Sequence, residues 1–216
     1  MKVDFVSDIA CPWCAVGLNA LEIALQRVGA DIPVELHFQP FELNPQMGPD
    51  GQDAVAYLSA KYGISAEQIA RNQAAIRERG AAVGFSFGPR ARVWNTFDAH
   101  RLLHWAGVEG PAGAQRALKH ALLQACHGQG RNPSDAQVLL EAATGAGLDA
   151  ARARQVLDSD EFSAEVRQAE AFWQQAGIRS VPSVVVNDRH LIQGGQPPEV
   201  FEQALRQIAA PEGETS

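Results

Sequence analysis

The strongest constraint on the fold is a pair of cysteines, Cys11 and Cys14, that follows a short apolar segment at residues 3–6. That segment has the length and composition of a buried strand. Pro12 suits the first turn of a helix, where its missing N–H would have no partner, and the apolar positions beyond it keep helical spacing up to Gly29. The sequence therefore predicts a strand running into a helix, with both thiols at the junction.

Composition excludes several classes of partner. The chain has 216 residues, 46% of them hydrophobic, which is enough for one sizeable core. Its net charge is −7 and no block of Lys or Arg stands out, so we expect no nucleic-acid partner. No apolar stretch approaches the ~20 residues of a membrane span, and no export signal precedes the first strand. With only three cysteines, we expect a soluble cytoplasmic protein without a membrane partner.

A second strand and a long helical block follow. Residues 34–38 alternate apolar and polar side chains, as a strand with one buried face does, and Pro40 ends the pattern. Two strands joined by one helix should be parallel, with the site at the carboxyl end of the first. Residues 44–177 are rich in Ala, Gln and Arg at helical spacing. The expected helices cover residues 53–62, 66–83, 96–106, 112–125, 135–145, 150–157 and 161–176.

The last part of the sequence predicts a hairpin and a final helix. Two apolar runs flank a turn at Asn187-Asp188, and Pro197 opens an amphipathic helix. Residues 211–216 are polar, and we expect them to be frayed. The whole order predicts an α/β protein, a thioredoxin fold with a large inserted α-helical subdomain. Its expected parts are a discontinuous sheet domain and the helical insertion, at residues 1–43 with 178–210 and at residues 44–177.

The two cysteines differ in their expected chemistry. Cys11 stands at the helix start, where unpaired N–H groups and the helix dipole stabilise a thiolate, so it should be the attacking thiol. Cys14 lies one turn inside and should resolve a mixed disulfide at Cys11. Trp13 offers an apolar platform beside the sulfur. The pattern predicts a redox-active Cys11–Cys14 disulfide that requires no other cofactor.

The alternative interpretation of the cysteine pair is half of a zinc site. A structural zinc ion usually takes four protein ligands. The sequence offers no second Cys-x-x-Cys and no suitably spaced His pair. We therefore predict no metal site.

A second element, Val181-Pro182, precedes an apolar run that reads as a strand. A proline at such a place is ordinarily an edge or turn residue. In a thioredoxin fold, however, the proline before this strand is cis and faces the dithiol, which leaves the preceding backbone free to pair with a substrate. We expect a cis bond here, close to the Cys11 sulfur. The expected substrate-binding residues are Pro12, Trp13, Val181 and Pro182.

With both elements placed, the chain resembles the DsbA family of the thioredoxin superfamily, and within it the FrnE-like branch. The resemblance covers nearly the whole chain. The same branch includes 2-hydroxychromene-2-carboxylate isomerases and kappa-class glutathione transferases, which commonly carry serine where Cys11 stands. Besides the two elements above, the resemblance rests on Pro40-Phe41-Glu42-Leu43-Asn44-Pro45, Asn95-Thr96 with Ala99-His100-Arg101-Leu102, and Gly194-Gly195-Gln196-Pro197-Pro198. Two departures are Ser180, where such proteins usually have glycine, and Cys126, where they usually have an aromatic residue.

The resemblance also implies a place for glutathione. In the glutathione-using relatives, the loop before the last helix binds the γ-glutamyl end of the peptide, and here that loop is Gly194, Gly195 and Gln196. A helix start can offer free N–H groups to a carboxylate. The alternative is a simple turn with no ligand.

Other residues have structural interpretations. Cys126 follows apolar helix positions and should behave as a small buried hydrophobe, with a regulatory thiol as the alternative. His100 and His104 are one helical turn apart, but no third metal ligand is evident, so helix packing is the favoured role. The resemblance places Asn95 and His100 at the interface of the insertion with the sheet domain. The tryptophans expected to pack in the insertion are Trp94, Trp105 and Trp173.

These observations predict a thiol–disulfide oxidoreductase or disulfide isomerase that acts on thiol or disulfide protein clients, with glutathione as a candidate co-substrate. One rival is a glutathione-dependent isomerase or transferase, in which Cys11 replaces serine without redox cycling. Another is a peptide-binding chaperone that uses the apolar surface around Trp13 and Val181. The direction of the reaction and the oligomeric state are not encoded in these patterns.

Overall fold

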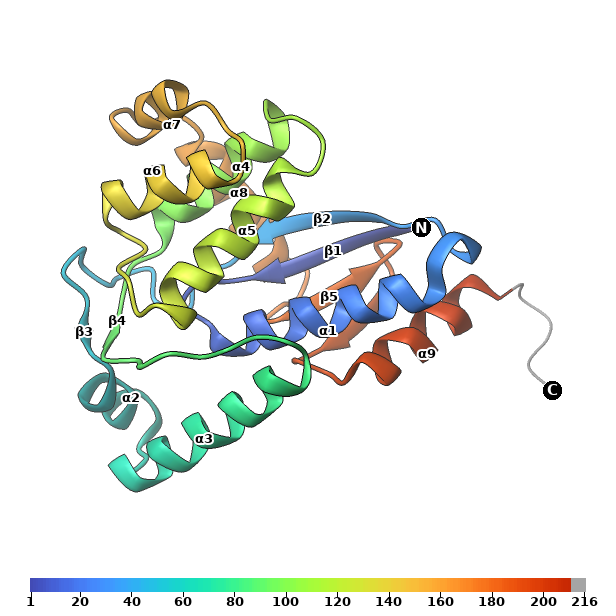
Figure 1. Ribbon diagram of the computed structural model, residues 1–216, viewed down its shortest axis with the longest axis horizontal. Coiled ribbons are helices and arrows are strands. Elements are labelled where there is room, and N and C mark those ends of the chain that lie inside the picture. The colour runs from blue at the N-terminus through green and yellow to red at the C-terminus, as the bar shows by residue number, and fades with distance from the viewer. Residues whose placement is uncertain (211–216) are drawn as a thin grey trace.

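The computed structural model describes residues 1–210, so the predicted tail at 211–216 lies outside the described residues. A four-stranded mixed sheet runs through the centre of the molecule in the order β2-β1-β5-β6 (Figure 1). β1 pairs with β2 in parallel and with β5 antiparallel, and β5 pairs antiparallel with β6. The strands are β1 (Lys2–Ser7), β2 (Glu35–Pro40), β5 (Ser183–Val186) and β6 (His190–Gln193). The predicted parallel pair and hairpin are both confirmed.

Helix α1 (Pro12–Val28) joins β1 to β2, as the sequence predicted. Its end at Gly29 has a positive φ of 55°, which glycine adopts without strain, and a 3₁₀ turn follows before β2. The last helix, α9 (Pro198–Ala209), packs along α1 on the same side of the sheet (Figure 1). Both helices on this side of the sheet, α1 and α9, thus have a proline in their first turn, Pro12 and Pro198 respectively.

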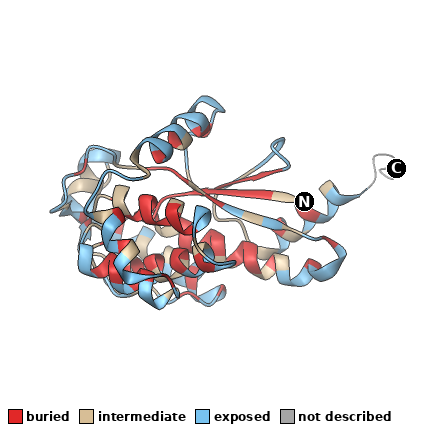
Figure 2. Ribbon diagram, turned by 90° about the horizontal axis from the view of Figure 1, so that it is seen from above, coloured by how far each residue is buried: buried red, intermediate tan, exposed pale blue. Residues whose placement is uncertain are grey.

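Alternation along the strands separates two apolar clusters. Val3 and Phe5 face the larger cluster, together with Phe201 of α9, and all three are fully buried. Val6 points to the opposite face, where it packs with Trp173. Figure 2 shows buried residues concentrated along the strands and the helix sides that face them. The sheet is therefore covered on both faces, and its ends are where a site can open.

The helical block has the order that the sequence predicted, with most boundaries within two residues. The last turn of the expected helix at 112–125 is a π-helical turn, Gln124–Gly128, which spacing alone does not reveal. A two-stranded ladder between β3 (Gln52–Asp53) and β4 (Arg92–Val93) was also not predicted, because two residues carry no periodicity. The helices are α2 (Ala54–Tyr62), α3 (Ala66–Ala82), α4 (Phe97–Val108), α5 (Ala114–Leu123), α6 (Ala136–Gly145), α7 (Ala150–Leu157) and α8 (Ser163–Gln175).

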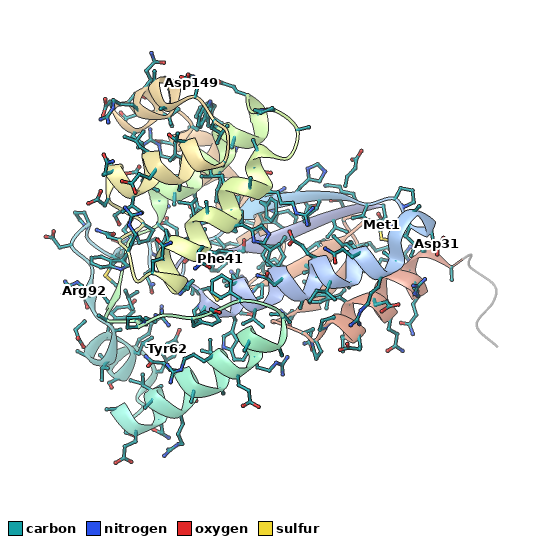
Figure 3. All side chains as sticks on the ribbon, viewed as in Figure 1. Met1, Asp31, Phe41, Tyr62, Arg92 and Asp149 are labelled. Atoms are coloured by element: carbon teal, nitrogen blue, oxygen red, sulfur yellow. The ribbon has the colours of Figure 1, made fainter. Side chains whose placement is uncertain are left out.

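Helices α2 and α3 form an arm on the far side of α1 from the helices α4–α8 (Figure 1). Only Ile69 and Gly80 of α3 are buried, so most of this helix faces solvent. Tyr62, labelled in Figure 3, ends α2 and is 56% exposed. The chain after α3 runs back past the start of α1 to β4 (Figure 1). The arm and this returning segment therefore flank the two cysteines.

No helix within residues 1–210 is both long enough and apolar enough to cross a bilayer.

Candidate functional site

The predicted cysteines lie where β1 gives way to α1. Cys11 caps the helix with extended backbone, at φ −90° and ψ 112°, and the Cys14 N–H donates to the Cys11 carbonyl at 3.0 Å. Cys14 has no exposed surface, whereas Cys11 keeps 4%. Both are free thiols. Because only Cys11 reaches the surface, it alone is placed to meet another molecule's sulfur.

The two thiols are electrostatically unequal. A hydrogen bond from the Cys14 thiol lowers the pKa of Cys11, and the positive charge of Arg90 lowers it further against the effects of burial and of Asp8. Burial raises the pKa of Cys14 well above its usual value, and the hydrogen bond to Cys11 adds to this. The pair therefore holds its negative charge on Cys11 and its proton on Cys14.

This asymmetry predicts the order of alkylation. Iodoacetamide reacts with thiolates, so at neutral pH it should modify Cys11 well before Cys14. The rate of Cys11 labelling should rise with pH through a midpoint below the ~8.5 of a free cysteine. Peptide mapping by mass spectrometry at a series of pH values measures this. Cys14 reacting first would reverse the assigned roles.

The second predicted element lies beside the first. The Val181-Pro182 peptide bond is cis, which confirms the prediction. The Cys11 Sγ lies 3.5 Å from the Val181 carbonyl oxygen, to which the protonated thiol can donate. Pro182 packs against α1 so closely that a Cβ on Gly17 would lie 2.9 Å from its ring. Two segments that lie about 170 residues apart in the sequence, those of Cys11 and Val181, thus meet at the Cys11 sulfur.

The predicted glutathione loop also adjoins the start of α1. Gly194 N–H donates to the Pro182 carbonyl at 2.8 Å, and Gly194 has a positive φ of 82°. A Cβ on Gly195 would lie 3.2 Å from the Trp13 carbonyl oxygen, so a side chain here would crowd the start of α1. Gln196 donates back to the Gln193 carbonyl at 2.7 Å. The structure therefore brings the loop together with Trp13, and whether it holds a ligand stays a prediction.

Asp8 anchors the polypeptide just before the dithiol, and sequence reasoning did not single it out. Its carboxylate is fully buried and accepts hydrogen bonds from Ala10 N–H at 3.0 Å, Leu43 N–H at 2.7 Å and the Thr96 hydroxyl at 2.7 Å. His100 lies 3.4 Å away. Burial alone would raise the pKa of Asp8, but His100 and these hydrogen bonds lower it. Asp8 therefore remains a buried anion that joins β1 to the helical insertion.

Lys119 of α5 is a second buried charge near the dithiol. Its side chain has no exposed surface, and its Nζ has no hydrogen-bond partner within the described part of the chain. Burial lowers the pKa of Lys119 to about 8, although the charges of Cys14 and Asp8 act in the opposite direction. An unpartnered buried amine is rare because its desolvation is costly. Such a group calls for a functional explanation.

The π-helical turn after α5 places His127 against the backbone just before Cys11. His127 Nε2 donates to the Ile9 carbonyl at 2.8 Å. Burial, together with the charge of Arg90, lowers the pKa of His127 to about 3, so the ring stays neutral. Neighbouring Cys126 is partly buried against the large apolar cluster, and burial raises its pKa to about 12. Cys126 thus packs as the sequence interpretation expected and lacks the acidity of Cys11.

Several other polar and aromatic residues of the helical insertion serve the framework. Arg92, labelled in Figure 3, donates to the Asp50 and Gly51 carbonyls near the edge of the molecule. Arg101 donates to carbonyls in the last turn of α7 and just after it, including that of Glu161 at 2.9 Å. His104 stacks near Phe162 instead of facing the cysteines. Asn95 links α4 to the Met47 carbonyl at 3.0 Å, and Trp105 and Trp173 are buried while Trp94 is half-buried.

Residues 1–210 contain no group of three or more His, Cys, Asp or Glu side chains arranged to hold a metal ion.

A dithiol at a helix start, beside a cis-proline that enters the neighbouring strand, defines the class of thioredoxin-fold dithiol proteins. Within that class, the chain belongs to the DSBA-like thioredoxin domain family, whose model matches residues 2–206. It is 39% identical to a probable DsbA oxidoreductase of Streptomyces coelicolor, whose structure superposes with a TM-score of 0.89 over 96% of this chain and 89% of that one.

Two more distant structures share the fold. A 2-hydroxychromene-2-carboxylate isomerase is 16% identical, with a TM-score of 0.74 over 96% of each chain. The cytosolic disulfide reductase DsbM of Pseudomonas aeruginosa, solved with GSH, is 17% identical, with a TM-score of 0.63 over 96% of this chain and 98% of that one. The family resemblance and the fold predicted from the sequence are both confirmed.

Proposed function

We propose that this protein is a cytoplasmic thiol–disulfide oxidoreductase or disulfide isomerase whose redox centre is Cys11–Cys14. The observation that carries the proposal is the placement of the two thiols, with Cys11 at the start of α1 beside the cis Val181-Pro182 bond and Cys14 fully buried behind it. The lowered pKa of Cys11 and the raised pKa of Cys14 divide their roles in the same way. A dithiol so divided can attack and then resolve. An isomerase that only holds a glutathione sulfur has no use for the second thiol.

The reaction begins at Cys11. Its thiolate attacks one sulfur of a substrate disulfide, and the other substrate sulfur leaves as a thiolate. The substrate is now joined to Cys11 as a mixed disulfide. In the extended segment before Pro182, the Val181 backbone lies beside the reacting sulfur and can align a peptide substrate in the manner of an added strand. Trp13 and Pro12 provide the apolar surface next to the Cys11 sulfur.

The second step falls to Cys14. Its thiol must lose a proton before it can attack the Cys11 sulfur, and its side chain has no surface exposed to solvent. Lys119, with its pKa near 8, is partly neutral at physiological pH and is close enough to Cys14 for their charges to interact. We assign it as the acceptor of that proton. Cys14 then forms the Cys11–Cys14 disulfide and releases the substrate as a thiol, so two electrons pass from the dithiol to the substrate.

All steps are reversible, so the same centre can oxidise dithiols when its disulfide form predominates. Thiol or disulfide protein clients are the proposed substrates, with glutathione as co-substrate. The direction depends on the reduction potential of the Cys11–Cys14 couple relative to the potential of its compartment. For this two-electron couple, a difference of ~30 mV corresponds to ~1.4 kcal/mol.

Equilibration in glutathione redox buffers tests the proposal. Samples poised at different ratios of reduced to oxidised glutathione are acid-quenched, alkylated and mapped by mass spectrometry. We expect one two-electron transition between the Cys11–Cys14 dithiol and its disulfide, while Cys126 remains alkylated throughout. Persistence of the dithiol across all ratios, or pairing that involves Cys126 instead, would contradict the assignment. The midpoint then gives the direction of the reaction.

A further inference from the structure

A groove opens beside the dithiol, between the arm helix α3 and the start of α1. Its wall includes Pro12 from the motif, Arg77 from α3, and Phe87 and Arg90 from the segment that returns past α1. The groove is partly open to solvent, and the space between these side chains is about 30 Å³. This leaves room for a small polar group such as a carboxylate, not for a whole tripeptide. The groove therefore starts at the residue next to Cys11 and leads away from it.

The charge of this groove is positive in a protein whose net charge is −7. Arginines elsewhere, such as Arg116 and Arg152, form ion pairs with glutamates. Within residues 1–210, neither Arg77 nor Arg90 lies within 4.0 Å of a carboxylate oxygen, which is also true of several other arginines such as Arg71. Arg77 and Arg90 differ from those in that both line one groove beside the dithiol. Two unpaired guanidinium groups that line one groove are complementary to an anionic ligand, and carboxylates match their planar geometry.

Arg90 is also held in place toward the reacting sulfur. Its Nη2 donates to the Ala10 carbonyl at 3.2 Å, one residue before Cys11. The influence of its charge on the pKa of Cys11 agrees with that position. Only one of its five N–H donors is used in this hydrogen bond. The others are available to a ligand that reaches the groove from Cys11.

Helix α3 is tied to the other side of the site as well. Arg79 Nη2 donates to the Gly195 carbonyl at 3.2 Å, so α3 spans from the groove to the loop of Gly194, Gly195 and Gln196. That loop lies against Trp13. A ligand attached to Cys11 would thus have the arginine groove on one side and the glycine loop on the other.

We propose that Arg77 and Arg90 bind the carboxylate that directly follows a substrate cysteine, as the glycyl carboxylate follows it in glutathione. This inference rests on the proposed redox function and gives its co-substrate, glutathione, a recognition site beside Cys11 that a protein client does not use. One residue of extended chain spans about 3.5 Å, so a carboxylate one residue beyond a cysteine bound to Cys11 remains beside Pro12. A protein client continues as a chain at this point and brings no carboxylate.

The test compares three disulfides against the reduced protein in single-turnover reactions at pH 7 and low salt. They are oxidised glutathione, the disulfide of glutathione esterified at its glycyl carboxylate, and hydroxyethyl disulfide, which is neutral. Acid quench and mass spectrometry give the second-order rate constant for oxidation of the dithiol. The wild-type protein should react at least about tenfold faster with oxidised glutathione than with its ester.

Arg77→Gln should remove most of this difference. The rate constant for oxidised glutathione should fall about tenfold. The ratio of this rate constant to that for the esterified disulfide should then approach one. Arg71→Gln, on the same helix but outside the groove, is the matched control and should keep the wild-type ratio. An unchanged ratio of glutathione to ester in Arg77→Gln would overturn the inference, provided that hydroxyethyl disulfide is reduced. Failure to reduce any of the three would overturn the proposed function together with it.

Discussion

Replacing Cys14 with serine should trap mixed disulfides on Cys11, and replacing Cys11 with serine should abolish disulfide exchange altogether. Cys11 carries the accessible thiolate, so without it no first attack occurs. The loss should be on the order of a thousandfold or more, as for other catalytic nucleophiles. In Cys14→Ser the attack still occurs, but the release step has lost its thiol, and the adduct accumulates.

Two measurements separate these outcomes. Non-reducing mass spectrometry of Cys14→Ser, incubated with oxidised glutathione or a disulfide-bonded client, should show the adduct at Cys11. Insulin-disulfide reduction and dithiol oxidation should both be absent in Cys11→Ser. Cys126→Ser is the matched control, because its thiol has a pKa raised to about 12 and takes no part in the proposed reaction.

The same variants distinguish the redox proposal from a glutathione-dependent isomerase. An isomerase needs only an activated glutathione sulfur, so it should survive Cys11→Ser, since serine commonly serves that position in the isomerases and transferases that this chain resembles. Its isomerase activity should also change little in Cys14→Ser. Glutathione-dependent isomerisation that persists in Cys11→Ser, with no adduct in Cys14→Ser, would overturn the leading assignment.

Local sequence patterns were sufficient to predict the framework of this site. A short apolar run marked β1, period-two alternation marked β2, helical spacing marked α1, and proline positions marked the helix starts. The dithiol and the cis bond could be predicted because each depends on a contiguous motif of two to four residues. Their proximity followed from the order of strands, since β1 and β5 had to be neighbours for the predicted fold to close.

The groups that tune the dithiol could not be found in this way. In the sequence, Lys119 occupies one polar position of an ordinary amphipathic helix. No neighbouring residue in the sequence indicates that its side chain points into the core. His127 depends on a π-helical turn, which shifts the register of the helix and so changes which side chain faces inward. Asp8 stands beside the motif, but its partners Thr96 and His100 come from some 90 residues away. Such contacts are properties of the packing between the sheet and the insertion.

Lys119→Met is expected to stabilise the protein while it slows the resolving step. Lys119 has a folded pKa of about 8 against 10.5 for a free lysine, because burial disfavours its charge. The unfolded chain therefore binds this proton more tightly, and folding below pH 8 is penalised by about 3 kcal/mol. The penalty disappears as pH rises from 8 toward 10.5. Methionine fills a similar volume without charge, so its stabilising effect should be largest at neutral pH.

Denaturant unfolding at pH 7 and pH 10 measures this effect. The wild-type protein should gain stability relative to Lys119→Met between these two pH values, as the buried ammonium loses its proton. Arg71→Met, which removes an exposed charge from α3, is the control and should shift stability by less than about 0.5 kcal/mol. If Lys119→Met is instead destabilised at pH 7, then the lysine is held by favourable interactions, and the interpretation of a desolvated, proton-accepting amine is wrong.

The kinetic half of the prediction follows from the same charge. Lys119→Met removes the proposed acceptor of the Cys14 proton and the positive charge that lowers the pKa of Cys14, so release of a mixed disulfide at pH 7 should slow by about a hundredfold. Attack by Cys11 should change much less, because its pKa is set mainly by the Cys14 hydrogen bond, which lowers it, and by burial, which raises it. The slowed release should recover as pH rises and Cys14 ionises unaided. Stopped-flow release of glutathione from the preformed adduct gives the pH profile, and a uniform slowing at every pH would contradict a role in proton transfer. A variant that is more stable at neutral pH yet slower in this one step would show that the buried amine is kept for chemistry at the expense of stability.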